Sequence, residues 1–133
     1  MLFRSRVTPD GSILVVASIR GETNFTGTIN PGRLEYNIEA AGNLAHRIWR
    51  RLDPHGQVAQ VACVAAIPDA QYKVFGMPSG NVTSMSMNLP YTVVAPDPPV
   101  VAPRGQLSSE AHVRRMFAEV RRVFQDAGAM ANQ

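Results

Sequence analysis

The sequence contains one cysteine, Cys63, which lies in an apolar segment. A single cysteine cannot form an internal disulfide, and without a cysteine pair the chain has no zinc-binding pattern. We therefore interpret Cys63 as a small core residue rather than a reactive thiol.

Long apolar runs are also missing. No segment approaches the ~18 apolar residues that a membrane-spanning helix needs. The N-terminus has no signal-peptide pattern, because residues 1–3 are followed at once by Arg4 and Arg6. We expect a protein that is made in a cytoplasm and does not enter a membrane.

The motifs of common enzyme classes are absent as well. The sequence has no HExxH or HxxxH pattern, no Gly-rich phosphate loop and no GxSxG nucleophile motif. Its three histidines fall in different predicted elements: His46 in a strand, His55 in a turn and His112 in the first turn of the helix. We predict that the protein is not an enzyme and needs no metal or other cofactor.

Lysine is nearly absent, since twelve of the thirteen basic residues are arginine and only Lys73 is lysine. The net charge is +3. The guanidinium group matches phosphate with a planar fork of donors, so this composition favours an anionic partner. A GC-rich coding sequence would explain the same composition equally well.

The composition that remains fits one globular domain. The 133 residues are 45% hydrophobic and 17% charged, which is enough apolar material for a core and too little charge for a disordered chain. We treat residues 1–133 as a single domain with an N-terminal hairpin (1–19), a main sheet (25–95) and a C-terminal helix (108–128).

Most of the chain shows the patterns of strands and turns. Segments 2–7 and 12–19 flank Thr8-Pro9-Asp10-Gly11, a tight-turn signal that predicts a hairpin. We predict further strands over 25–29, 33–39, 44–52, 57–67 and 81–94. For residues 35–52 a helix is the alternative, because several apolar residues recur at helical spacing; Gly42 and Asn43 in the middle favour strands.

The last part of the chain changes period from 2 to 3.6. After a Pro-rich stretch (95–104), Ser108 is a suitable N-cap and Gly128 a suitable end for an amphipathic helix. Its apolar stripe includes Val113, Met116, Phe117, Val120 and Phe124. The predicted fold class is α+β, an antiparallel meander sheet followed by one helix. No neighbouring helix helps to cover the sheet, so we expect a second chain to complete the core.

One face of the predicted sheet is polar. A four-residue turn at 53–56 pairs strand 44–52 with strand 57–67 and places Arg47, Trp49, Arg51 and Gln60 together; strand 81–94 adds Ser84, Ser86 and Asn88. Arginine binds phosphate, tryptophan stacks on bases, and serine and asparagine contact base edges or the 2′-hydroxyl. The pattern predicts an RNA-binding face, with an ordinary solvated sheet face as the alternative.

The order of these segments resembles the coat proteins of single-stranded RNA bacteriophages, the leviviruses. The resemblance covers nearly the whole chain. It rests on the N-terminal hairpin, the Arg-bearing strand 44–51, the apolar strand 57–68 ending in proline, the loop 69–80, the alternating strand 81–90 and a helix opening at Ser108-Ser-Glu. Ala62 and Val64 depart from the pattern because family members often have polar or basic residues there, and the single helix departs from the usual two.

This resemblance implies a homodimer that assembles into an icosahedral virion shell around a single-stranded RNA genome in the bacterial cytoplasm. It implies that the helix stripe, Val113, Met116, Phe117, Val120 and Phe124, packs on the partner's sheet. It also implies assembly contacts from the loop residues Asp69, Tyr72, Lys73, Phe75 and Pro78. The alternative is a small cytoplasmic, dimeric α+β module that binds nucleic acid or peptide.

Overall fold

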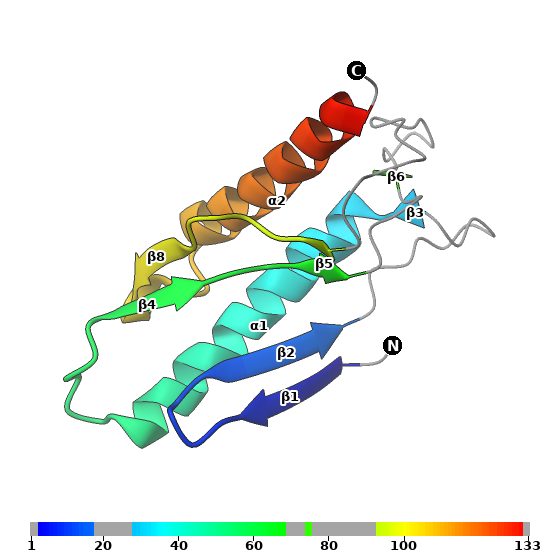
Figure 1. Cartoon of the computed structure of the whole chain (residues 1–133). Helices are drawn as coiled ribbons and strands as arrows, with labels where there is room; N and C mark the ends of the chain where they lie inside the picture. The colour runs from blue at the N-terminus through cyan, green and yellow to red at the C-terminus, as the bar shows by residue number, and fades with distance from the viewer. Residues whose placement is uncertain (1–2, 18–27, 69–73, 76–92, 132–133) are drawn as a thin grey trace.

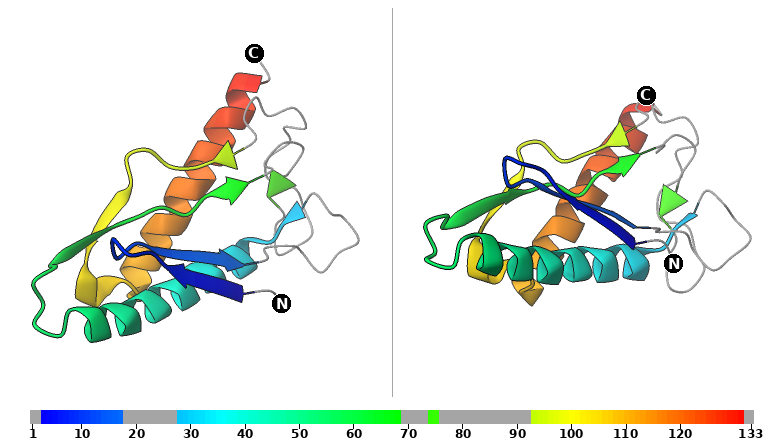
Figure 2. Two further views of the ribbon diagram at one scale, coloured as in Figure 1. Left: turned by 60° about the horizontal axis from the view of Figure 1, so that its bottom comes forward. Right: turned by 90° about the horizontal axis from the view of Figure 1, so that it is seen from below.

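Two helices, α1 (Pro31–Leu52) and α2 (Glu110–Ala131), dominate this computed structural model, which describes residues 3–17, 28–68, 74–75 and 93–131 (Figure 1). The strands of this part of the chain are short. They are β1 (Phe3–Val7), β2 (Ile13–Ala17), β3 (Thr28–Ile29), β4 (Gln60–Cys63), β5 (Ile67–Pro68), β6 (Val74–Phe75), β7 (Val93–Val94) and β8 (Val100–Pro103). The β1–β2 hairpin and the β4–β8 ribbon lie on the same side of α1 (Figure 2). The predicted α+β class is confirmed.

The N-terminal hairpin is also confirmed, with β1 and β2 antiparallel and Phe3 opposite Ala17. Within its turn, Thr8 N donates to Ser12 O (2.9 Å) and Gly11 N donates to Thr8 O (3.0 Å). The Asp10 carboxylate accepts hydrogen bonds from Thr8 Oγ1 and from Ser12 N. Gly11 has φ +87°, a left-handed conformation that glycine adopts without steric cost, so the Asp-Gly pair sets the turn.

The strands predicted over 33–39 and 44–52 are wrong, because residues 31–52 form helix α1. Asn30 caps it, its side chain accepting from Arg33 N at 3.1 Å, and Pro31 occupies the first turn, where the missing N–H costs nothing. Leu34 and Ile38 lie one turn apart and are buried, so the apolar residues follow the helical period that the alternative reading used.

Gly42, which favoured strands in the sequence, serves a tertiary contact inside the helix. A Cβ atom at Gly42 would lie 2.0 Å from Leu107 O and 2.8 Å from the Leu107 carbonyl carbon. Only a residue without a side chain lets α1 approach the backbone that leads into α2 this closely. The helix-breaking signal of this glycine is therefore outweighed by packing.

The predicted meander is also corrected. Strand β4 pairs with β8, Gln60 opposite Pro103 and Cys63 opposite Val100, and not with residues 44–52. Strand β5 pairs with β7 in the same antiparallel sense, Ile67 opposite Val94. The Pro-rich stretch thus contains a strand, which its prolines permit because β8 pairs on one side only among the described residues.

Strands β3 and β6 form a short parallel pair, with Ile29 opposite Phe75. The backbone of Phe75 therefore belongs to a strand and not to the continuous loop that was predicted over 69–80. Most of the predicted strand 81–94 lies outside the described residues, and its last two residues form β7.

The hydrophobic core lies between the N-terminal half of α1, α2 and strands β5 and β8. Its buried members are Ile29, Leu34, Ile38, Ile67, Val100, Val113, Met116 and Val120, with Phe117 packed against them. The helix stripe that was assigned to a dimer core is thus covered within one chain at Val113, Met116 and Val120. The side chain of Phe124 lies outside the described set.

Both predicted ends of the C-terminal helix are corrected. Ser109, not Ser108, caps it, because Ser109 Oγ accepts from His112 N at 3.2 Å. The helix continues through Gly128 to Ala131. The favourable spacing of Glu110 and Arg114 gives an exposed ion pair of 2.6 Å.

Replacing Gly42 by alanine should destabilise the protein by about 2 kcal/mol or more, because the new methyl group meets backbone that cannot move aside independently. The measurement is chemical denaturation followed by circular dichroism. Gly32→Ala is the matched control in the same helix, since a Cβ there would meet only Asn30 Oδ1, at 3.4 Å. We expect that control to be neutral or stabilising by up to ~1 kcal/mol. Equal losses in both variants would contradict the close-approach explanation.

Candidate nucleic-acid interface

Three arginines gather at the C-terminal end of α1. Arg47, Arg50 and Arg51 are all exposed. Their spacings of three and four residues place them on one side of the helix, within a single turn of each other. The positive charges of Arg50 and Arg51 in the last turn also interact favourably with the negative end of the helix dipole.

None of these three arginines forms an ion pair with a described residue. Other arginines do: Arg114 pairs with Glu110, and Arg122 pairs with Glu119 and Asp126. Like charges one turn apart on a helix destabilise it by roughly 0.2–0.5 kcal/mol. The three guanidinium groups are therefore exposed, close together and without a described acidic partner.

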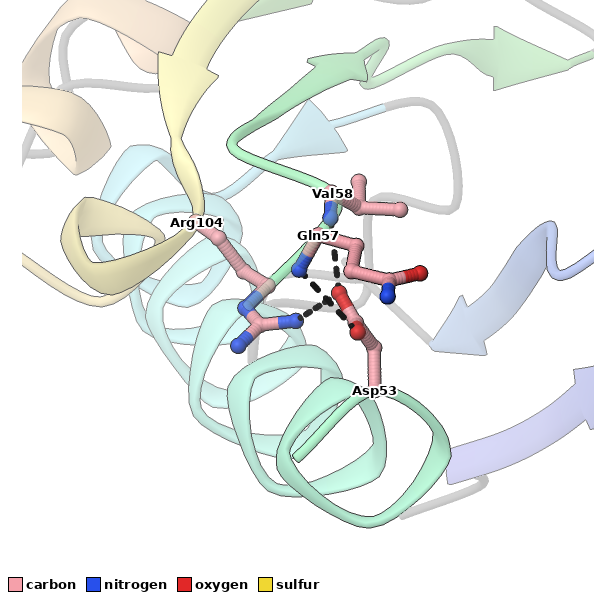
Figure 3. Close-up of polar contacts among 4 residues, drawn as sticks. All are labelled: Asp53, Gln57, Val58 and Arg104. Carbon is pink, nitrogen blue, oxygen red and sulfur yellow. Dashed lines mark hydrogen bonds and ion pairs between the residues drawn. The ribbon is translucent and has the colours of Figure 1, made fainter. Parts of the chain in front are cut away.

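A partly buried cluster of polar groups around Asp53 holds the C-terminal end of α1 in place (Figure 3). Asp53 Oδ2 accepts from Val58 N and from Arg104 Nη1, both at 2.7 Å, and Asp53 Oδ1 accepts from Gln57 N at 3.1 Å. Arg104 N in turn donates to Ala59 O at 2.9 Å. The carboxylate therefore ties the helix end to the loop that follows it and to the end of β8.

These contacts favour the ionised carboxylate. The hydrogen bond from Val58 N, with those from Gln57 and the charge of Arg104, holds the pKa of Asp53 below its ordinary value. The charge-assisted pair keeps Arg104 for a structural role, in contrast to the open arginines of α1.

Trp49 does not belong to the arginine cluster. Two residues along a helix correspond to about 200° of rotation, so Trp49 lies away from Arg47 and Arg51. A Cβ atom added to Gly11 would lie 3.3 Å from Trp49 Cη2, which places the indole against the tip of the hairpin. The prediction that Trp49 shares a face with Arg47 and Arg51 is wrong, because it assumed a strand.

Gln60, the fourth predicted residue of this set, opens β4 and is exposed. It follows Ala59, whose carbonyl accepts from Arg104, so it lies at the same end of the molecule as the Asp53 cluster. The other predicted RNA contacts, Ser84, Ser86 and Asn88, lie outside the described residues. So do Asp69, Tyr72, Lys73 and Pro78 of the predicted assembly loop.

The structure adds two arginines that the sequence did not single out. Arg4 and Arg6 alternate along β1 and are exposed, on the face of the hairpin that also carries Leu14 and Val16. Their period-2 spacing was the available signal. Neither arginine forms an ion pair with a described residue. Because Trp49 contacts the hairpin tip, this hairpin lies against the C-terminal half of α1 (Figure 1).

A groove of about 460 Å³ lies between the helices on an acidic part of the surface. The described residues that line it are Glu35, Glu39, Ser108, Glu110 and Val113. Within the described ranges, no group of three or more His, Cys, Asp or Glu side chains is arranged to hold a metal ion.

The other reactive side chains have unfavourable environments for chemistry. Burial lowers the pKa of His112, with help from the charge of Arg115, so its imidazole is held neutral. Burial raises the pKa of the Cys63 thiol, which reduces its thiolate fraction. Both residues contribute to packing, in keeping with the interpretation of Cys63 as a core residue.

Neither helix in the described part of the chain combines the length and apolarity needed to cross a lipid bilayer. Comparison with known proteins finds no matching family model, no matching curated protein and no matching solved structure.

Replacing Asp53 by asparagine should lower stability at pH 7 and change its dependence on pH. The folded pKa lies below the unfolded one, so the contribution of Asp53 is complete above about pH 4 and is lost as the pH falls through the folded pKa. The wild type and Asp53→Asn should thus converge in acid, measured by denaturation between pH 7 and pH 2.5. Asp126→Asn, at an exposed surface pair, is the control and should differ little at any pH. A constant gap for Asp53→Asn would contradict an ionic contribution.

Proposed function

We propose that this protein binds single-stranded RNA through its phosphates, using Arg47, Arg50 and Arg51 at the C-terminal end of α1. One observation carries the proposal: three exposed arginines lie within one helical turn, and no described acidic side chain neutralises them. The net charge of +3 works in the same direction by attracting anions to the surface.

The chemistry of the cluster points to backbone recognition rather than base readout. Guanidinium groups form bidentate hydrogen bonds with phosphate oxygens, and such contacts position a nucleic acid without reading its sequence. Trp49, the aromatic residue closest in sequence, is already engaged with Gly11. Binding should therefore tolerate different sequences and weaken steeply as salt is added.

The variant Arg47→Ala/Arg51→Ala should bind a single-stranded RNA oligonucleotide roughly tenfold or more weakly than the wild type at low salt. The slope of log K against log salt should become shallower by about 1.4, because each lost phosphate contact on a single strand contributes about 0.7. Fluorescence anisotropy over a series of salt concentrations measures both quantities.

The matched control is Arg114→Ala/Arg122→Ala, which removes the same charge from arginines that are already paired on α2. We expect this control to retain most of the affinity. Equal weakening in both variants would show that net charge alone governs binding. An unchanged affinity in Arg47→Ala/Arg51→Ala would refute the site.

We propose secondly that the chain self-associates, first as a homodimer, and coats RNA as the structural protein of a phage virion assembled in a bacterial cytoplasm. The support is the resemblance in segment order, of which the N-terminal hairpin and the C-terminal helix have the expected structure. The exposed apolar side chains Leu14 and Val16 add a surface suited to contact between copies. Residues 31–52 form a helix where the resemblance implies strands. The coat proposal is therefore decided by whether the protein assembles into particles.

Expression in bacteria followed by size exclusion, with absorbance at 260 and 280 nm and negative-stain imaging, tests the coat function. Megadalton, RNA-rich, round particles are the expected result. A small species that still binds added RNA would contradict the coat function and leave an RNA-binding module.

A further inference from the structure

We propose that the open face of the β1–β2 hairpin docks into the acidic groove between α1 and α2 of a second copy of this chain. The inference gives the self-association proposed above a specific pair of surfaces and rests on it. It does not depend on RNA binding by α1.

The first surface is the outward face of the hairpin. It carries two arginines on β1, Arg4 and Arg6, and two apolar residues opposite them on β2, Val16 and Leu14. Leu14 and Val16 are 58% and 51% exposed, so two aliphatic side chains lie beside the arginines on this face. The other face of β2 packs toward α1, so this outward face has no cover among the described residues.

The second surface is the groove at the junction of the two helices. Glu35 and Glu39 lie one turn apart on α1, both exposed, and neither forms an ion pair with a described residue. Glu110, which pairs with Arg114, lines the same groove from the start of α2, and the largely buried Val113 lies at its base. The groove therefore offers charge opposite to that of the hairpin.

The two surfaces complement each other in charge. Arg4 and Arg6 are residues i and i+2 of a strand, about 7 Å apart on one face, while Glu35 and Glu39 are about 6 Å apart on a helix. Two parallel ion pairs are therefore geometrically compatible. Each cluster alone has like-charge repulsion, and contact between copies would relieve both.

The contact joins different patches of the two copies. Reciprocal docking, with each hairpin in the groove of the other copy, closes the homodimer proposed above. One-way docking leaves one free hairpin and one free groove, and association then continues until a ring closes or a chain of subunits grows. A symmetric dimer through two hairpins is disfavoured, because it would bring the arginines of both copies together.

Charge reversal tests the pairing directly. Arg4→Glu/Arg6→Glu and Glu35→Arg/Glu39→Arg should each lose self-association at least about tenfold, since like charges would then meet. An equimolar mixture of the two variants should associate again, because each supplies the surface the other lacks. The chain with all four substitutions should also recover. Self-association is measured by sedimentation velocity after nuclease treatment, which removes bound RNA and its absorbance.

Arg115→Glu/Arg121→Glu is the control for net charge, since it makes the same change on exposed positions of α2. It should associate like the wild type, and thermal melts should show that all variants fold. A wild type that stays monomeric at every concentration would overturn the proposed self-association and this contact with it. A wild type that associates, with charge-reversed variants that still associate or a mixture that does not recover, would overturn this contact alone. Loss of RNA binding with unchanged association in Arg4→Glu/Arg6→Glu would assign the hairpin to RNA and overturn the docking.

Discussion

The contact between Gly42 and the backbone at Leu107 is the constraint on which the rest of the structure depends. It brings α1 against the chain that enters α2, so the two helices share one core, and Leu107 itself is almost completely buried. The contact also fixes the direction of α1 beyond Gly42. That second half of the helix carries the arginine cluster on its exposed side and Trp49 beneath the hairpin tip.

The sequence predicted the elements whose signals are local. The hairpin follows from Pro9-Asp10-Gly11, and α2 follows from an uninterrupted apolar stripe. It failed for 31–52 because a glycine was interpreted through its helix propensity of about 1 kcal/mol, whereas the structure uses its lack of a side chain. The pairing of β4 with β8 could not be predicted, since an adjacent turn at 53–56 gave a competing local solution and the true partner is about forty residues away.

For the candidate site too, the sequence predicted what depends on local spacing and missed what depends on packing between distant segments. Arg47 and Arg51 share a face under either a strand or a helix, because spacings of four residues suit both periods. Trp49 shares that face only in a strand, and in helix α1 it lies away from the two arginines. The alternation along β1 places Arg4 and Arg6 on one face of the hairpin. Only the packing of the opposite face toward α1 shows that the face with the arginines is the exposed one.

The Asp53–Arg104 ion pair joins residues 51 positions apart, and the Gly42–Leu107 contact joins residues 65 positions apart. Such a contact can form only after both of its residues have been synthesised. During synthesis, which proceeds from the N-terminus, the first half of α1 is complete long before its partners leave the ribosome. The native packing of this helix, and with it the fixed placement of its arginines, is therefore reached only after Arg104 and Leu107 have left the ribosome.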